Sequence, residues 1–148
     1  LFRSAAIQTQ ALVQLMDIAP TILEAAGIPI PGSFEAKSLW PILAGQSTQI
    51  RAEVYSELAR DHIQTGAEYI VMRRDARWKL VYYLGETHGE LYDLAADPGE
   101  HCNLWAVPEH IEKRDAMVRD LLEWSVRTAI FSRQQSGTKI NPQQPMRI

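Results

Sequence analysis

The sequence predicts an α+β fold, in which a four-stranded antiparallel sheet is packed by a long C-terminal helix and preceded by short helices. Three observations lead to this prediction. Residues 54–94 hold four short segments in which apolar and polar side chains alternate. Residues 108–130 repeat apolar side chains at helical spacing, and prolines and glycines punctuate two short segments before residue 48. Four strands at hairpin spacing form an antiparallel sheet with one face to cover, and the long helix can cover it.

The first short helix is predicted over residues 17–27. We expect the Asp17 side chain to cap its N terminus, and Pro20 falls in the first turn, where its missing N–H is not needed. Gly27 would end the helix as a left-handed C-cap. A longer helix that begins near Gln10 and bends at Pro20 is the alternative.

A second short helix and the strands follow. Ser38 is expected to cap this helix and Gly45 to end it. The four segments with a period of two are residues 54–58, 68–73, 78–84 and 90–94. After the last of them, the sequence Asp-Pro-Gly at residues 97–99 is typical of a turn in which Gly99 takes a positive φ.

The long helix is predicted to begin at Pro108 and to run to about residue 130. Its apolar side chains form one row with further residues beside it: Ile111, Val118, Leu122 and Val126 in the row, and Met117, Leu121 and Trp124 beside it. We expect this row to lie on the sheet. Leu122→Ala would then cost roughly 2 to 5 kcal/mol, as truncations in a protein core do.

The bulk properties exclude some classes of function. The chain has 148 residues, a single-domain length, and its net charge of -3 leaves no basic stripe for a phosphate backbone, so we expect no nucleic-acid partner. One cysteine cannot form an internal disulfide. No apolar run is long enough for a membrane span, and the run in LFRSAAIQTQ is too short for a signal peptide. Periplasmic, secreted and cytoplasmic locations all stay open.

Two stretches of the sequence resemble one enzyme family. They are LVQLMDIAPTILEAAGIPIPGSFEAKSLWPILAG, at residues 12–45, and WKLVYYLGETHGELYDLAADPGEHCNLW, at residues 78–105. In order and spacing they are similar to the C-terminal portion of a type I sulfatase, a formylglycine-dependent arylsulfatase of the alkaline phosphatase superfamily. The resemblance implies three parts: residues 1–48 as the end of the α/β catalytic domain, residues 49–132 as the C-terminal subdomain, and residues 133–148 as a polar tail.

The resemblance also implies what this chain lacks. The family's nucleophile is a formylglycine made from the cysteine of a Cys-x-Pro/Ala-x-Arg motif, and its cofactor is a divalent cation, usually Ca²⁺. Cys102 does not fit that motif, because Leu104 and Ala106 occupy the positions of Pro/Ala and Arg; a small buried residue or an inert thiol is the simpler interpretation. We therefore expect no catalytic residue, metal ligand or cofactor in this chain, which would be inactive without its partner, the upstream catalytic domain.

Two other functions stay open. A phosphonate monoester hydrolase or phosphodiesterase of the same superfamily can share this C-terminal pattern. A non-enzymatic module could instead bind a glycan or a partner through exposed aromatic rings; the candidates are Trp78, Tyr82, Tyr83 and Tyr92. Core packing of the same rings is the competing interpretation.

The candidate site residues lie on a loop. Arg60, Asp61 and His62 follow the first predicted strand, where substrate-contacting groups are commonly carried, and they are candidates for the rim of the substrate entrance. A cluster that could be drawn as a metal site is better explained as turn chemistry: Asp93, Asp97, Glu100 and His101. Self-association through the N-terminal segment is expected, because it carries apolar side chains that need cover: Ile18, Ile22, Leu23 and Ile28.

Overall fold

The computed structural model describes residues 8–59 and 68–135. Its elements are, in chain order, η1 Leu15–Asp17, α1 Ile18–Ala25, α2 Trp40–Leu43, β1 Glu53–Ala59, β2 Tyr69–Asp75, β3 Trp78–Tyr83, β4 Gly89–Asp93, η2 Pro108–His110 and α3 Ile111–Gln135. This order confirms the predicted α+β fold, and each predicted strand matches an observed one to within one or two residues at either end. The long helix runs five residues further than predicted.

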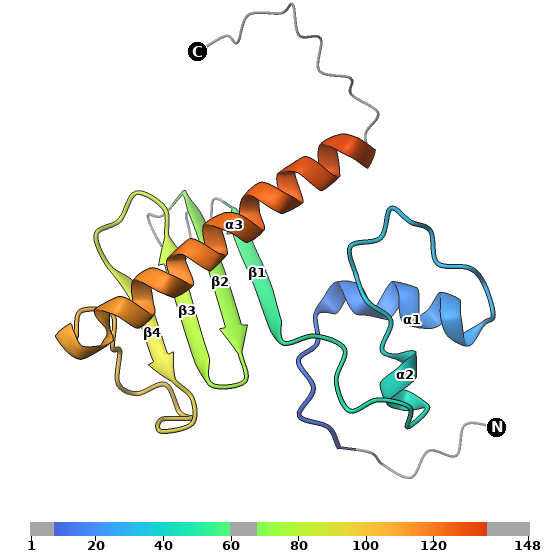
Figure 1. The fold of residues 1–148 in the computed structure, drawn as a ribbon, viewed down its shortest axis with the longest axis horizontal. Coiled ribbons are helices and arrows are strands. Elements are labelled where there is room, and N and C mark those ends of the chain that lie inside the picture. The colour runs from blue at the N-terminus through green and yellow to red at the C-terminus, as the bar shows by residue number, and fades with distance from the viewer. Residues whose placement is uncertain (1–7, 60–67, 136–148) are drawn as a thin grey trace, which may run out of the picture.

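The four strands form one antiparallel sheet in the order β1-β2-β3-β4. Figure 1 shows α3 crossing one face of this sheet. The turn between β2 and β3 is fixed by Asp75, whose Oδ1 accepts hydrogen bonds from the backbone N–H groups of Arg77 (2.8 Å) and Trp78 (2.7 Å). This tight hairpin turn sets the register of the two central strands, β2 and β3, in which Val71 lies opposite Tyr82.

The core lies between the sheet and α3. It consists of side chains that alternate along the strands and of one side of the helix: Val71, Leu80, Leu91, Met117 and Leu121. Leu80, Leu91 and Met117 are fully buried. Partly buried aromatic rings pack around this cluster, among them Tyr82, Trp105 and Trp124. The alternation along the strands therefore places one set of side chains, including Val71, Leu80 and Leu91, against the helix.

The side of α3 that meets the sheet differs from the prediction. Leu122 is 65% exposed and Val126 is 51% exposed, whereas Met117 is fully buried and Leu121 is 5% exposed. The expected burial of Leu122 and Val126 was therefore wrong. The apolar stripe of α3 is wider than its contact with the sheet: the residues expected beside the row pack on the sheet, and of the row itself Val118 does. The helix also continues past the β1 edge of the sheet, where no strand lies beneath it (Figure 1).

The first helix forms as predicted at its C terminus but not at its N terminus. Gly27 has φ 70° and closes the helix with two backbone bonds, from Gly27 N to Glu24 O (3.0 Å) and from Ile28 N to Leu23 O (2.9 Å), the pattern of a Schellman motif. Asp17 makes no side-chain capping bond, because its carboxylate is engaged elsewhere. Residues 8–14 are not helical, so the longer helix from Gln10 does not form.

Two turn predictions had different outcomes. Gly45 has φ 69° just after the end of α2, as expected. Ser38 is not the N-cap of this helix, because Leu39 holds that position without a side-chain capping bond; Ser38 Oγ accepts a hydrogen bond from Trp40 N (3.0 Å) one residue further out. In the turn after β4, however, the positive φ belongs to Glu100 (57°) and not to Gly99. A Cβ at Gly99 would lie against the ring of His101, an exposed side chain, which would have to turn away.

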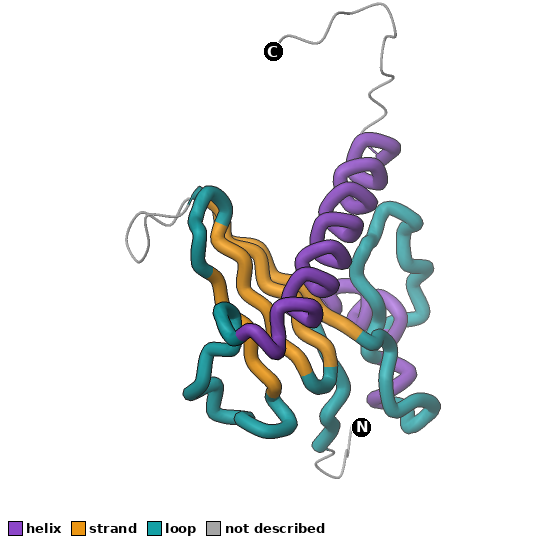
Figure 2. The backbone as a smooth tube through the Cα atoms, turned by 60° about the vertical axis from the view of Figure 1, so that its left-hand side comes forward, coloured by secondary structure: helices purple, strands orange, loops and turns teal. Residues whose placement is uncertain are grey.

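The chain thus has two parts that we name by their residues. The helical block comprises residues 8–43, with η1, α1 and α2, and the sheet unit comprises residues 53–135. Figures 1 and 2 show the helical block beside β1, at the edge of the sheet farthest from β4. Within residues 8–59 and 68–135, no helix combines the length and the apolarity that a membrane crossing requires.

Candidate functional site

The three predicted rim residues, Arg60, Asp61 and His62, lie outside the described residues. What can be placed is the end of the sheet from which their loop departs. Ala59 ends β1 and lies opposite Tyr69, the first residue of β2. The rim assignment therefore stays a prediction.

The described part of the chain does not supply a metal site. No three His, Cys, Asp or Glu side chains within it lie close enough to hold an ion. The acidic residues near the turn after β4 are engaged in other ways: Asp93 pairs with Arg77 (2.7 Å) and Asp97 Oδ2 accepts a bond from Cys102 N (2.8 Å). Glu100 pairs with Lys79. These residues do not fit the oxygen-rich cage that Ca²⁺ requires.

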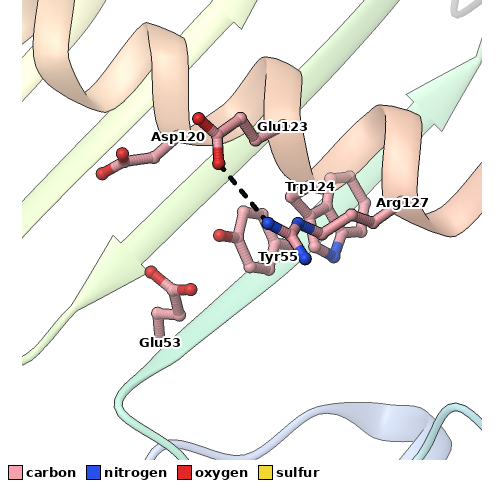
Figure 3. Close-up of a pocket in the computed structure, with 6 residues that line it drawn as sticks. All are labelled: Glu53, Tyr55, Asp120, Glu123, Trp124 and Arg127. Carbon is pink, nitrogen blue, oxygen red and sulfur yellow. Dashed lines mark ion pairs between the residues drawn. The ribbon is translucent and has the colours of Figure 1, made fainter.

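A pocket of about 320 Å³ lies between β1 and α3 (Figure 3). We call it the edge pocket; its lining residues are Glu53, Tyr55, Asp120, Glu123, Trp124 and Arg127. The rings of Tyr55 and Trp124 stack with their centroids 4.2 Å apart and their planes 2° from parallel. The other lining side chains are charged, and Glu123 pairs with Arg127 at 3.8 Å one turn further along α3.

Arg73 neutralises part of this acidic pocket from within the sheet. Its side chain is 10% exposed, and its Nη2 donates to Glu53 Oε2 (2.6 Å) and lies 3.3 Å from Asp120 Oδ2. Arg73 Nη1 is buried without a hydrogen-bond partner, 3.6 Å from Asp75. The carboxylates of Glu53 and Asp120 are therefore occupied by an internal cation.

The phenol of Tyr55 in the edge pocket is not suited to proton transfer at neutral pH. Burial raises the pKa of Tyr55 to about 12, with Arg73 lowering and Glu53 raising it by smaller amounts. A phenol with this pKa stays protonated, and a general base needs a pKa nearer the working pH. The geometry is that of a structural contact between β1 and α3.

The four aromatic candidates for a glycan platform lie on opposite faces of the sheet. Trp78 and Tyr82 pack against the core beneath α3, whereas Tyr83 and Tyr92 lie on the other face. Tyr83 donates its O–H to Glu90 Oε1 (2.6 Å), and Lys79 Nζ lies 5.9 Å from the centroid of the Tyr92 ring. A single stacking platform cannot be built from the four rings.

Sequence reasoning missed the most completely buried polar group of the described chain. Asp17 is 0% exposed and forms a two-pronged ion pair with Arg51, whose side chain is 7% exposed. Burial alone would raise the pKa of Asp17, but hydrogen bonds from Arg51 and from the N–H groups of Gln14 and Lys37 outweigh it and hold the pKa below its ordinary value.

Cys102, expected to be a small buried residue or an inert thiol, is exposed.

A four-stranded antiparallel sheet under one long C-terminal helix, joined to a short helical block, is the architecture of a C-terminal sulfatase domain. Residues 3–127 match the family described as "N-sulphoglucosamine sulphohydrolase, C-terminal". The chain belongs to this family.

Named relatives are sulfatases of several kinds. The chain is 30% identical over 139 residues to arylsulfatase K of Xenopus laevis. The matched region covers 86% of this chain and 26% of arylsulfatase K. It is 32% identical over 100 residues to a delta 4,5-hexuronate-2-O-sulfatase of Bacteroides thetaiotaomicron, covering 64% of this chain and 20% of the relative. The chain thus spans about a quarter of the length of the curated relatives it matches.

Solved structures point to the same superfamily. A 2-O GAG sulfatase, BT1596, superposes with a TM-score of 0.65 at 30% identity, over 84% of this chain and 26% of that one. The phosphonate monoester hydrolase SpPMH from Silicibacter pomeroyi superposes with a TM-score of 0.63 at 28% identity, over 75% of this chain and 24% of that one. The fold is therefore shared by hydrolases of sulfate esters and of phosphonate esters.

Proposed function

We propose that the chain is the C-terminal part of a longer sulfatase, in which it completes the fold and shapes the substrate entrance. Residues 1–48 would close the catalytic domain, and residues 49–132 would form the C-terminal subdomain. The observation that carries the proposal is the family match over residues 3–127, together with named sulfatase relatives about four times as long as the match.

The chemistry would belong to the upstream portion. In that portion a formylglycine would be the nucleophile, and a divalent cation such as Ca²⁺ would stabilise charge on the sulfate. The described residues of this chain offer no donor set for the ion. We therefore propose that this chain alone hydrolyses no sulfate ester.

The test is an assay of the longer polypeptide that contains this sequence, coexpressed with a formylglycine-generating enzyme. The substrates are an aryl sulfate and an aryl phosphonate monoester, and the 148-residue chain alone is the control. Higher kcat/KM on the sulfate supports the proposal. Preference for the phosphonate supports the second candidate, which the similarity to SpPMH favours. Turnover of neither ester, or turnover by the chain alone, overturns the assignment.

Within the longer polypeptide, we propose that Arg60, Asp61 and His62 select the group attached to the sulfate. Loops that follow strands commonly carry substrate contacts, and this loop leaves the sheet from the end at which β1 terminates. Transition-state contacts to the sulfate would come from the upstream portion, so these side chains would affect leaving-group recognition more than the chemical step.

Arg60→Ala and His62→Ala test this role. We expect kcat/KM to fall for sulfated sugars and to change little for a minimal aryl sulfate. Arg119→Ala, an exposed change on α3, is the matched control. Equal losses on all substrates would indicate a catalytic role, and no loss on any would indicate a solvated loop.

We also propose that the exposed apolar side chains of the helical block contact the upstream portion, and that the isolated chain covers them by forming a dimer. Leu15 is 86% exposed and Ile22 is 62% exposed, and others nearby are about half exposed: Val13, Met16, Ile18 and Ile28. Apolar surface of this kind on a soluble monomer commonly marks a contact with another protein surface.

Light scattering after size exclusion tests the dimer. The isolated chain is expected to have twice the monomer mass, and the double variant with Ile18→Ser and Ile22→Ser is expected to be a monomer. Val126→Ser removes an equally exposed apolar side chain from α3 and should leave the dimer intact. A monomeric parent chain, or dissociation by Val126→Ser, would contradict the assignment of this surface.

A further inference from the structure

The helical block and the sheet unit meet at one buried polar group. Both carboxylate oxygens of Asp17 accept hydrogen bonds: Oδ1 from Lys37 N (3.0 Å) and from Arg51 Nη2 (2.6 Å), and Oδ2 from Gln14 N (2.8 Å) and from Arg51 Nη1. Arg51 lies two residues before β1, whereas the other three residues belong to the helical block. The ion pair therefore joins the helical block to the connecting segment, residues 44–52, two residues before β1 begins.

Two further hydrogen bonds leave the helical block, one for the sheet unit and one for the connecting segment. Gln14 Nε2 donates to Tyr55 O (2.7 Å) within β1, and Lys37 Nζ donates to Ile50 O (3.3 Å) just before Arg51. Gln14 and Lys37, whose backbone N–H groups donate to Asp17, thus also donate through their side chains to residues on either side of Arg51. The two acceptors, Ile50 and Tyr55, and the ion-pair partner Arg51 all lie within residues 50–55.

Apolar contact at the boundary is incomplete. Val54 of β1 is buried, but a hollow of about 570 Å³ lies between the segment before α1 and the outer face of the sheet. Its lining includes Val13, Leu15 and Met16 on one side and Val54, Ser56 and Met72 on the other. The two-pronged guanidinium–carboxylate pair adds a constraint on the angle between the two parts, because both of its bonds are directional.

We propose that Asp17 and Arg51 are positioning residues, whose ion pair sets the orientation of the sheet unit relative to the helical block. The consequence for substrate selection rests on the proposed function. β1 begins at Glu53 and ends at Ala59, immediately before the candidate rim residues, so a rotation at Arg51 is carried along the strand to its far end. In the longer hydrolase, the pair would hold that end of the sheet at the substrate entrance.

The orientation can be measured in the 148-residue chain itself. Cys102 is free and exposed in the sheet unit, and Ala26→Cys adds a thiol at the exposed end of α1. Spin labels on both thiols, diluted with unlabelled chain so that distances within one molecule dominate, give a distance distribution by pulsed electron paramagnetic resonance. We expect a narrow distribution that Arg51→Gln broadens or shifts.

Arg77→Gln is the matched control, because it breaks the Arg77–Asp93 pair inside the sheet unit and leaves the boundary untouched. Its distribution should stay narrow. If Arg51→Gln does not fold, Arg51→Lys, which keeps the charge but not the fork, and Gln14→Ala, which removes the bond to Tyr55 O, take its place. Unchanged distributions in the variants that fold would overturn the proposal.

The longer polypeptide supplies the functional readout. Arg51→Lys is expected to raise KM for an extended sulfated sugar by on the order of tenfold, as misplacement of a binding group does, with kcat on a minimal aryl sulfate unchanged. Equal effects on both substrates would overturn the positioning role. Absence of hydrolase activity in the unmodified polypeptide would instead defeat the proposed function, and the distance measurement would still decide the structural proposal.

Discussion

The ring of Tyr55 lies flat against the ring of Trp124, with 4.2 Å between their centroids. Tyr55 belongs to β1, the strand at the edge of the sheet, and Trp124 lies near the middle of α3. The contact therefore ties the helix to the strand that leads from the helical block. It also marks the place at which α3 leaves the sheet, because the apolar side chains beyond it, such as Val126 and Ile130, are about half exposed.

Trp124→Ala should destabilise the sheet unit. Truncation of a packed tryptophan costs about 3 to 5 kcal/mol, and the partial burial of this ring places the expected loss of unfolding free energy at the lower end. Trp124→Phe keeps an aromatic ring against Tyr55 and should retain much of the stability. Chemical denaturation followed by far-ultraviolet circular dichroism measures both. Equal losses for the two variants would mean that the stack contributes little.

Adjacent leucines on α3 provide a second test. Leu121 is 5% exposed and Leu122 is 65% exposed, so Leu121→Ala should cost roughly 2 to 5 kcal/mol and Leu122→Ala less than about 0.5 kcal/mol. The two variants remove the same atoms from the same helix and differ only in environment. A reversed order of the two denaturation midpoints would show that the other side of α3 faces the sheet.

Gly89 is required by a neighbouring ring. A Cβ at this position would lie 2.5 Å from Trp105 Cζ3, much closer than carbon atoms pack. Gly89→Ala should therefore displace Trp105 and cost roughly 1 to 3 kcal/mol, as overpacking in a core does. Gly32→Ala, where a Cβ would meet nothing within 4 Å, is the control and should be nearly neutral. Near-neutrality of both changes would contradict the tight packing.

The predictions from sequence succeeded where a local rule decides the structure. Alternation along residues 78–84 identified the buried strand face, and Gly27 ended its helix as expected, because both depend on residues close in the chain. The expected burial of Leu122 was wrong because helical spacing defines a wide apolar stripe but not the part of it that a sheet contacts. Asp17 was expected to cap a helix, because only its neighbours in the chain could be used for the prediction. Its partner, Arg51, lies 34 residues away, and no local pattern connects the two.

The candidate site was predicted less completely than the fold. The rim assignment of Arg60, Asp61 and His62 rests on the position of a loop in the sequence, and it needs the variants described above. The edge pocket was not predicted, because it combines residues of β1 with residues of α3. Such a combination follows from the tertiary packing, which the periodicity of the sequence does not specify.

Alkaline titration should reveal tyrosines that resist ionisation. Burial raises the pKa of Tyr55, Tyr69 and Tyr83, and together with smaller contributions from Glu57 beside Tyr69 and Glu90 beside Tyr83 it brings each pKa to about 12. The unfolded value is about 10, so the folded state binds more protons between about pH 10 and 12 and loses stability as the pH rises through that range. Absorbance at 295 nm should rise later in the folded chain than in denaturant.

Glu90→Gln offers a control for that titration. It removes the carboxylate that accepts the hydrogen bond from Tyr83 and that also raises the pKa of Tyr92, so the apparent pKa values of these two tyrosines should fall while those of Tyr55 and Tyr69 stay unchanged. Superimposable titration curves for the folded and unfolded chain would contradict the burial of all three phenols.

The Asp17–Arg51 pair should control stability at acid pH. Asp17→Asn leaves the Arg51 guanidinium buried without its counter-charge, and the loss of one partner of a buried pair costs about 3 to 5 kcal/mol. Because the folded-state pKa of Asp17 is depressed, its stabilising contribution is present above the unfolded pKa of about 3.9 and is lost as the pH falls through the lower folded value. The unfolding free energy of the unmodified chain should therefore decrease as the pH falls below about 4, and that of Asp17→Asn should decrease less.

Glu123→Gln, which breaks an exposed pair with Arg127, is the control and should cost less than about 0.5 kcal/mol at neutral pH. Parallel acid profiles for the unmodified chain and Asp17→Asn would mean that the carboxylate does not titrate with folding.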